Sequence, residues 1–423
     1  MSTQPSLSSP LLAMSKLPRQ IWILALGRLL SEIGSGFTLF YAPIFFVQQV
    51  GLSATAVGLA LGSASISGIV GRVLSGTYAD RWGRKPMLLI ATAVLAIACG
   101  IFTITNDFPT LIAGCLVQGL GLGLYWPANE AIVADLSTGE TRRFAYAITR
   151  LADNVGMGLG IIAGGLLISS TGAYRSLFII DGISFCCFFL TLAIGIRETL
   201  QSPKRPGRLF SGYTTALRDR RLLVYVIVNI IFTIYISQTQ TTLPLYFSGF
   251  VPQAAAQGFN PQVISALFTG HLLMTIAFQL PILKLLEKLS QARSLMISGG
   301  FWAVGFGCMT MTGVSTSYQL LWANLGLGLF ALAIVAYTPT ASALIADLAP
   351  ASLRGVYTSI NSLCWAVGYA VGPPLGGWAL DLSTEFAHGF WLGLAATVQI
   401  VWAILWWLAR LIEVRTDSII DNQ

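Results

Sequence analysis

The sequence predicts an all-α membrane protein whose twelve transmembrane helices form two pseudo-symmetric six-helix bundles. The first observation is composition, because 55% of the 423 residues are hydrophobic and only 10% are charged, whereas soluble domains carry about 25% charged residues. The second is that long apolar segments follow one another along the whole chain. The third is an internal repeat, in which residues of the first half recur in the second half at a constant spacing.

Twelve segments are long and apolar enough to be membrane spans, which need about 20 residues each. In lipid, such a segment satisfies its backbone hydrogen bonds internally only as a helix. In chain order the expected spans are 21–49, 55–79, 86–105, 109–135, 144–170, 175–196, 222–248, 263–286, 293–313, 318–347, 355–381 and 387–411.

The basic residues indicate the topology of these spans. Lys and Arg gather at alternate span ends, and the opposite ends have only Arg175. This positive-inside bias predicts that both termini are cytoplasmic. It also accounts for the net charge of +7, so nucleic-acid binding is not expected. The six cysteines lie inside spans as packing residues, and neither a disulfide, a metal site nor a cofactor is expected. The first fifteen residues show no cleavable signal peptide.

A charged connector at 197–221 divides the chain. We expect a disordered cytoplasmic N-terminus at 1–16, a first bundle at 17–196, a second bundle at 222–411 and a cytoplasmic tail at 412–423. Residues of the first bundle recur in the second at an offset of 212, since 347 − 135 = 212 and 372 − 160 = 212. The repeated set includes Tyr125, Pro127, Asp135, Arg142, Gly156 and Gly160, matched by Tyr337, Pro339, Asp347, Arg354, Gly368 and Gly372.

The charged segment 76–85 between the second and third spans is the most specific motif. It resembles the loop signature of the major facilitator superfamily, Gly-x-x-x-Asp-Arg-x-Gly-Arg-Lys, at every fixed position. The resemblance implies that Asp80 lies at the N-terminus of the eleventh helix near Gly355, where the helix dipole favours an anion, and that Arg84 pairs with Asp135. We call this set the cytoplasmic latch: Gly76, Asp80, Arg81, Gly83, Arg84, Lys85 and Asp135.

In the family this latch forms in the outward-open state and breaks in the inward-open state, which biases a two-state equilibrium. The two glycines are expected to allow close backbone approach. An ordinary positive-inside loop is the alternative interpretation. Glu287 and Lys288 are a weaker echo in the second half, where a poorer latch is expected.

Glycines four residues apart predict tight helix packing. The run from Gly368 to Gly377 resembles a motif that antiporters of the superfamily carry in their fifth helix, although the fifth span here has Ile161 in place of its proline. Packing alone is the alternative. The expected packing residues are Gly156, Gly160, Gly368, Gly372, Pro373 and Gly376.

Ionisable residues inside spans are candidates for proton coupling, because burying charge is costly. The arginine that proton-linked members carry in the fourth helix is Cys115 here. Arg28 and Glu32 share one helical face, and Glu32 lies roughly 16 Å into the membrane. Three interpretations stay open: a self-neutralising Arg28–Glu32 pair, proton exchange at Glu32, and substrate contact. His271 and Asp153 are weaker candidates. Glu130 is expected to pair with Arg150, and Asp181 with Arg175.

The resemblance also places the central cavity among spans 1, 4, 7 and 10, with a contribution from span 11. Aromatic rings with sparse polar groups suit an amphipathic ligand. The candidate cavity residues are Tyr41, Gln118, Trp126, Asn129, Gln238, Gln240, Tyr246, Asn324, Tyr337, Asn361 and Trp365.

We see no enzyme signature. The motif at 76–85 and the segment 217–221 before the seventh span resemble those of the bacterial twelve-helix drug:proton antiporters. This resemblance implies a secondary transporter. The expectation is a monomer in the inner membrane that exports amphipathic small molecules in exchange for protons. An uptake symporter or facilitator for a sugar or organic anion is the alternative, since Arg28 suits an anion. A membrane sensor or lipid-handling protein is the alternative from another class.

Overall fold

The computed structural model describes residues 17–200, 212–253, 257–350 and 353–420. The side chains at 80, 139, 140, 143 and 412–420 are outside this description. The expected N-terminal segment 1–16 and most of the connector, 201–211, therefore lie outside the described residues. Within the described part the chain is helical, and its only β pairing is an isolated bridge between Pro252 and Gln257.

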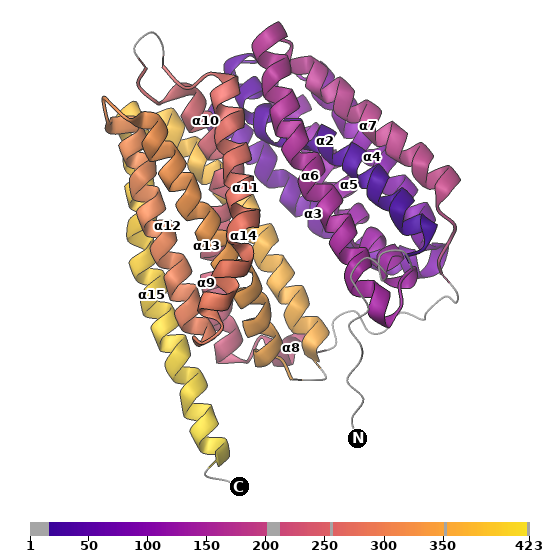
Figure 1. Cartoon of the computed structure of the whole chain (residues 1–423), viewed down its shortest axis with the longest axis vertical. Helices are drawn as coiled ribbons and strands as arrows, with labels where there is room; N and C mark the ends of the chain where they lie inside the picture. Colours follow the sequence, from indigo (N-terminus) through magenta and orange to yellow (C-terminus); the bar gives the residue numbers. More distant parts are fainter. Residues whose placement is uncertain (1–16, 201–211, 254–256, 351–352, 421–423) are drawn as a thin grey trace. The chain divides into compact units, whose positions relative to one another are not determined.

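The described helices are labelled in chain order in Figure 1. Their bounds are α2 Arg19–Gln48, α3 Ala54–Trp82, α4 Arg84–Ile104, α5 Phe108–Asp135, α6 Gly139–Thr171, α7 Tyr174–Gly195, α8 Tyr213–Ala216, α9 Arg220–Gln240, α10 Thr242–Gly249, α11 Pro261–Leu286, α12 Gln291–Val314, α13 Gln319–Leu348, α14 Arg354–Leu382 and α15 Thr384–Ile420.

Several helix ends follow directly from local sequence. The Asp107 carboxylate accepts a 2.9 Å hydrogen bond from the Thr110 amide and begins α5, because a side-chain oxygen satisfies a first-turn N–H. At the start of α11, the side-chain oxygen of Asn260 likewise accepts a hydrogen bond from the Val263 amide. Gly172 ends α6 with φ 65°, a left-handed conformation that glycine adopts without steric cost.

The predicted spans are largely confirmed. Eleven helical segments in the described residues are long and apolar enough to cross a membrane, with α9 and α10 joined as one segment. Helix α14 has the length of a span, 29 residues, but is not among the eleven. The last predicted span, 387–411, corresponds to Thr384–Leu411, within a helix that continues to Ile420. The connector contains the short helix α8, and α9 begins at Arg220.

The chain divides into two compact units. Unit 1 comprises Met1–Ala42 and Ile66–Gly207, and unit 2 comprises Pro43–Ser65 and Arg208–Gln423. This division differs from the one expected from the sequence, because residues 43–65 belong to the first six spans yet group with unit 2.

Unit 1 is held by helix contacts that need small residues. Helix α4 packs on α5 and α7. Where α2 meets α6, a Cβ on Gly160 would collide with the carbonyl oxygen of Ile33 and would stand 3.0 Å from the Cα of Gly36. Gly71 of α3 and Gly123 of α5 approach each other in the same way. These backbones approach closely because no side chain stands between them.

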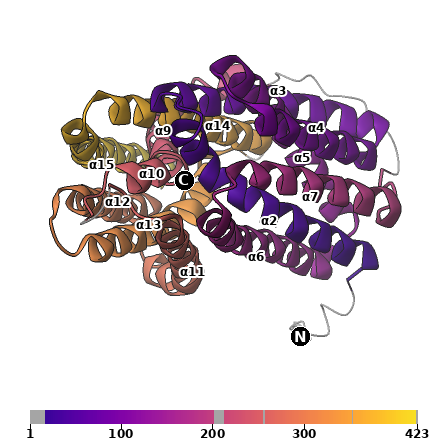
Figure 2. The ribbon, with the colours of Figure 1, turned by 90° about the horizontal axis from the view of Figure 1, so that it is seen from above.

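In unit 2, α12 lies beside α13 and α15, and α14 packs on α9 (Figure 2). Aromatic rings fill the core, with Trp302 centred 4.8 Å from Phe330 and 5.5 Å from Phe306. Gly368 and Gly372 of α14 face Thr233 and Ser237 of α9. The fifth span thus packs by equivalent glycines on the first span of its own half in both units, as the repeat predicts.

Candidate functional site

Arg28 is the centre of a polar cluster inside unit 1. It lies on α2, has no exposed surface and forms a two-point ion pair with Asp153 of α6. Its Nε donates to Asp153 Oδ1 at 2.7 Å, and its Nη2 donates to Asp153 Oδ2. Bidentate arginine–carboxylate contacts are the stronger kind of ion pair. The buried positive charge is therefore compensated by α6.

This partner differs from the Arg28–Glu32 pair, which was one of the three interpretations left open by the sequence. Glu32 lies one turn further along α2 and is half-buried, but no hydrogen bond or ion pair reaches its carboxylate from the described residues. The two side chains share a helical face, as predicted, yet Arg28 is already occupied. Among the described residues, Glu32 is therefore an acidic group inside a span with no cation bonded directly to it, although Arg28 and Arg150 act on it electrostatically.

An aromatic ring joins this cluster to a second ion pair. The guanidinium carbons of Arg28 and Arg150 lie 5.6 and 5.4 Å from the ring centroid of Trp126, within range for cation–π attraction. Arg150 Nη2 also binds Glu130 Oε1 at 3.1 Å, which is the pairing expected from the sequence. Trp126, a candidate cavity residue, is thus held between two cations.

The same cluster contains buried polar atoms without a protein partner. Among the described residues, no hydrogen bond reaches the Tyr125 hydroxyl, the Asn129 side-chain amide or Nη1 of Arg28. Tyr125 and Asn129 are one turn apart on α5, and Tyr125 interacts electrostatically with Arg28. Buried polar groups are nearly always satisfied by protein or ordered water. This part of unit 1 is therefore suited to water or a polar ligand group.

The cytoplasmic latch motif at 76–85 is almost entirely helical. Helix α3 runs through the motif to Trp82, and only Gly83, with φ 109°, separates it from α4. Arg84 Nε contacts Asp135 Oδ2 at 2.5 Å, which agrees with the pairing implied by the resemblance. Lys85 Nζ donates to the Ala193 carbonyl at 2.7 Å. Arg81 is exposed, and the Asp80 side chain lies outside the described residues.

Glu198, which the sequence analysis missed, closes the start of α4. Its carboxylate accepts backbone hydrogen bonds from Arg84 at 3.0 Å and Lys85 at 3.1 Å, and a Cβ at Gly83 would collide with it. Burial opposes its ionisation, but the backbone N–H groups, including those of Thr199 and Leu200, outweigh this and hold the Glu198 pKa below 4.5. Gly83 thus has the close approach expected of it.

Gly76 does not share this role. A Cβ at Gly76 would have no atom of the described residues within 4 Å, apart from its chain neighbours and the nearby backbone of its own helix. The close approach expected at Gly76 is absent there.

The second half repeats the latch pair with a glutamine in place of the arginine. Gln291 Nε2 donates to Asp347 Oδ2 at 2.6 Å. Asp347 is the repeat partner of Asp135, and Gln291 follows Arg84 by the offset of the weaker echo, since 291 − 84 = 207 and 287 − 80 = 207. An amide replaces the guanidinium, so this contact lacks the charge of its counterpart.

Aromatic and amide side chains meet in unit 2 among α9, α13 and α14. Asn361 Oδ1 accepts from Tyr225 at 2.7 Å and from Asn229 at 2.9 Å, and Tyr337 donates to Asn229. The ring of Trp365 lies 6.3 Å from Tyr337. The structure therefore brings three predicted cavity residues, Tyr337, Asn361 and Trp365, together. Asn229 completes the cluster and was missed, because it had no distinguishing sequence signal.

Other cavity candidates are buried in contacts between helices of their own bundle. Gln238 is buried and donates to the Gly372 carbonyl at 2.8 Å, so it joins α9 to α14. Tyr246 is buried and bonds to His388 at 2.8 Å. Tyr41 is also buried. In this structure these three side chains lie in contacts between helices, and their assignment to a cavity stays a prediction.

The remaining candidates make other contacts. Gln240 reaches the second cluster through Tyr369, whose ring is stacked on Trp365 with the centroids 6.2 Å apart. Gln118 is half-buried on α5, Gln240 accepts from Tyr369 at 2.9 Å, and exposed Asn324 bonds to its own helix. His271 Nδ1 lies 2.9 Å from the Leu327 carbonyl, a packing contact between α11 and α13.

Asp181 does not serve Arg175. It is buried and accepts from Thr38 at 2.6 Å. Arg175 instead donates to the Thr103 carbonyl at 2.5 Å.

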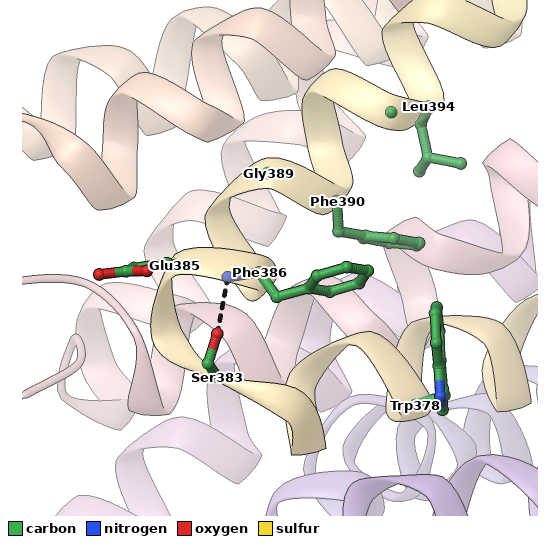
Figure 3. A pocket seen from close by; sticks show the side chains of 8 residues that line it. Trp378, Ser383, Glu385, Phe386, Gly389, Phe390 and Leu394 are labelled. Carbon is green, nitrogen blue, oxygen red and sulfur yellow. Dashed lines mark hydrogen bonds between the residues drawn. The ribbon is translucent and has the colours of Figure 1, made fainter.

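A pocket of about 600 Å³ lies where α14 meets α15 (Figure 3). Its wall is largely apolar, with the rings of Trp378, Phe386 and Phe390 on one side and Glu385 at the edge. It contains none of the predicted site residues. Exposed aromatic rings are common where helices meet the membrane interface, so the pocket is not assigned to the transport site.

Comparison with known families identifies the class of protein. The Major Facilitator Superfamily matches residues 24–251 and 246–420. The chain belongs to this superfamily, whose members are secondary membrane transporters rather than enzymes. The fold class and the family expected from the sequence are confirmed.

The chain is also similar to individual members of the superfamily and to solved structures. The chain is 25% identical to the multidrug resistance protein MdtH of Edwardsiella ictaluri (strain 93-146) over 399 residues, covering 91% of this chain and 93% of that protein. It is 29% identical to MdtH of Escherichia coli O9:H4 (strain HS), covering 82% of each chain. The nucleoside transporter NupG matches with a TM-score of 0.80 at 13% identity, covering 92% of this chain and 99% of that chain. That last likeness shows the fold alone.

Proposed function

We propose that this secondary transporter exports amphipathic small molecules, including drugs, in exchange for protons. It acts as a monomer in the inner membrane with both termini in the cytoplasm. Similarity to proteins named for multidrug resistance supports the substrate class. The alternation of basic residues along the chain supports the orientation. The two six-helix halves, 17–196 and 222–411, rock about the substrate to expose it to each side in turn.

The position of Glu32 is the observation that carries the proton coupling. A carboxylate inside a span is costly to ionise unless it is paired, and no partner reaches it from the described residues. Arg28 supplies a positive charge one turn away but is compensated by Asp153. Glu32 is therefore free to take up and release a proton as its access to water changes.

Asp153 and Arg28 act as positioning residues in this proposal. The family's fourth-helix arginine is replaced by buried Cys115, and Arg28 provides the buried cation from α2 instead. Trp126, Tyr337 and Trp365 offer ring faces for a lipophilic or cationic substrate.

The test uses everted membrane vesicles with an established pH gradient. Lipophilic cations, neutral drugs and organic anions are added, and proton release is followed for the protein and for Glu32→Gln. The matched control is Glu385→Gln, which makes the same change at an exposed position on α15. Substrate-induced proton release that is lost only in Glu32→Gln supports the proposal. Equal release in all three proteins contradicts coupling through Glu32.

Uptake of an organic anion is the weaker alternative, because Arg28 is buried and already neutralised. Substrate accumulation inside intact cells, with no proton release on drug addition, would favour it. Absence of gradient-dependent flux for every compound would favour a sensor or lipid-handling role.

A further inference from the structure

The start of α3 is fastened by a residue from the end of α14. Asp381 Oδ1 accepts a hydrogen bond from the Ala54 amide at 2.9 Å. Asp381 Oδ2 accepts from the Thr55 amide at 2.7 Å and from the Thr55 hydroxyl at 2.6 Å. All three residues lie in unit 2. One carboxylate from a distant helix thus holds two amides of the first turn.

The rest of that first turn is capped locally. The Ala56 amide donates to Ser53 Oγ at 3.1 Å. The first-turn N–H groups of a helix have no partner within the helix, and Ser53 is the residue that ordinarily caps them. Asp381 therefore supplements a local cap rather than replacing a missing one.

The location of Asp381 indicates a purpose beyond α14 itself. It is the last residue but one of α14, which ends at Leu382. An anion is unfavourable at a helix C-terminus and favourable at an N-terminus. Asp381 is thus poorly placed for its own helix and well placed for α3.

Close backbone contacts continue below this cap. A Cβ on Gly377 would collide with the Ala54 carbonyl oxygen, and a Cβ on Gly58 would collide with the Pro373 carbonyl oxygen. A Cβ on Gly62 would stand 2.5 Å from the Ala370 carbonyl oxygen. Only hydrogen atoms fit between these backbones. Any separation of α3 from α14 therefore breaks the contact.

The arrangement mirrors the cytoplasmic latch. Asp80 is near the C-terminal end of α3, and the family resemblance assigns it to the N-terminus of α14. Asp381 is near the C-terminal end of α14 and binds the N-terminus of α3. The resemblance thus implies a second carboxylate for the other end of the same helix pair.

We propose that Asp381 is an outer latch, which holds the start of α3 against α14 in one state of the transport cycle and releases it in the other. The charge at the helix N-terminus, together with the hydroxyl of Thr55, stabilises the fastened state. Opening of the outer side separates α3 from α14 and exposes the Ala370 contact. The inference rests on transport by rocking halves, and not on the proposed substrate or on proton coupling.

The experiment measures access to Ala370 from outside the cell. Ala370→Cys is labelled in intact cells with a membrane-impermeant maleimide, and the unsubstituted chain gives the background from its own cysteines. Asp381→Asn keeps the shape of the side chain and removes its charge. We expect it to raise the labelling rate roughly two- to fivefold, the range for one charge at a helix N-terminus.

Two further variants complete the design. Thr55→Val removes one hydrogen bond and keeps the backbone contacts, so a smaller increase is expected; it also keeps the proposal testable should Asp381→Asn fail to reach the membrane. Glu385→Gln, the neighbouring exposed carboxylate, should label like the parent. Unchanged labelling in both Asp381→Asn and Thr55→Val would overturn the outer latch. Because labelling needs no substrate, this result is separable from failure of the drug–proton proposal.

Discussion

Arg28 is bonded to Asp153 through both carboxylate oxygens, although the two residues are 125 positions apart in the chain. Glu32 is much closer in sequence and does not make this contact. The pair joins the first and fifth spans of the first half, and it changes which acidic residue is available for protons. Asp153 neutralises Arg28, and Glu32 is the carboxylate that we propose for proton exchange.

Breaking this pair should destabilise the protein strongly. Asp153→Asn leaves Arg28 buried without a counter-charge, and we expect a loss of about 3–5 kcal/mol in the free energy of unfolding. Thermal unfolding in detergent measures it. Glu130→Gln, which removes the partner of the exposed Arg150, should cost about 0–1 kcal/mol. Similar losses in the two variants would contradict the assignment.

Replacing both partners separates stability from function. Arg28→Met combined with Asp153→Leu removes the charges together, and such replacements are often neutral or stabilising. We expect a folded protein with impaired transport, because the buried cation near Glu32 is gone. Transport at the parental rate would show that the pair is only structural. Yield and thermal unfolding of the double variant are measured alongside the flux.

The latch pair can be tested by giving it the chemistry of its repeat. Arg84→Gln reproduces in the first half the amide–carboxylate contact that Gln291 makes with Asp347. The variant should stay in the membrane and transport more slowly, because Asp135 loses the cation of its ion pair. Gln291→Ala is the control on the neutral copy and should have a smaller effect. Flux normalised to the amount of protein in the membrane decides between them.

Tight helix packing predicts a steric failure at one glycine and not at another. A Cβ at Gly372 would collide with Ser237 Oγ, whereas none of the described residues crowds the same position at Gly307. Gly372→Leu should therefore cost several kcal/mol or prevent folding, as overpacking does. Gly307→Leu should be tolerated. Comparable amounts of both variants after membrane extraction would show that the α9–α14 contact can accommodate the larger side chain.

The sequence predicted what depends on composition and spacing. Hydropathy located the spans, the constant offset revealed the repeat, and the motif at 76–85 indicated the Arg84–Asp135 pair. It could not predict that Arg28 selects Asp153, because the choice depends on how α2 and α6 are rotated about their axes. Glu198 and Asp381 were missed for a related reason, since each caps a helix that is remote in the chain.

Acid should weaken the protein partly through Glu198. Its pKa is lower in the folded chain than its ordinary value of 4.5, because backbone N–H groups bind its ionised form against the opposing effect of burial. A group with a depressed pKa contributes stability that is present above its ordinary value and is lost as the pH falls through the folded value.

Glu198→Gln lacks this charge at every pH. In thermal unfolding between pH 7 and about pH 3.5, the parent should therefore exceed the variant at neutral pH, and the gap should close below pH 4.5. Asp107 and Asp219, whose pKa values are also lowered, are common to both proteins and cancel in the comparison. A gap that stays constant over the whole range would mean that Glu198 stabilises α4 by shape and not by charge.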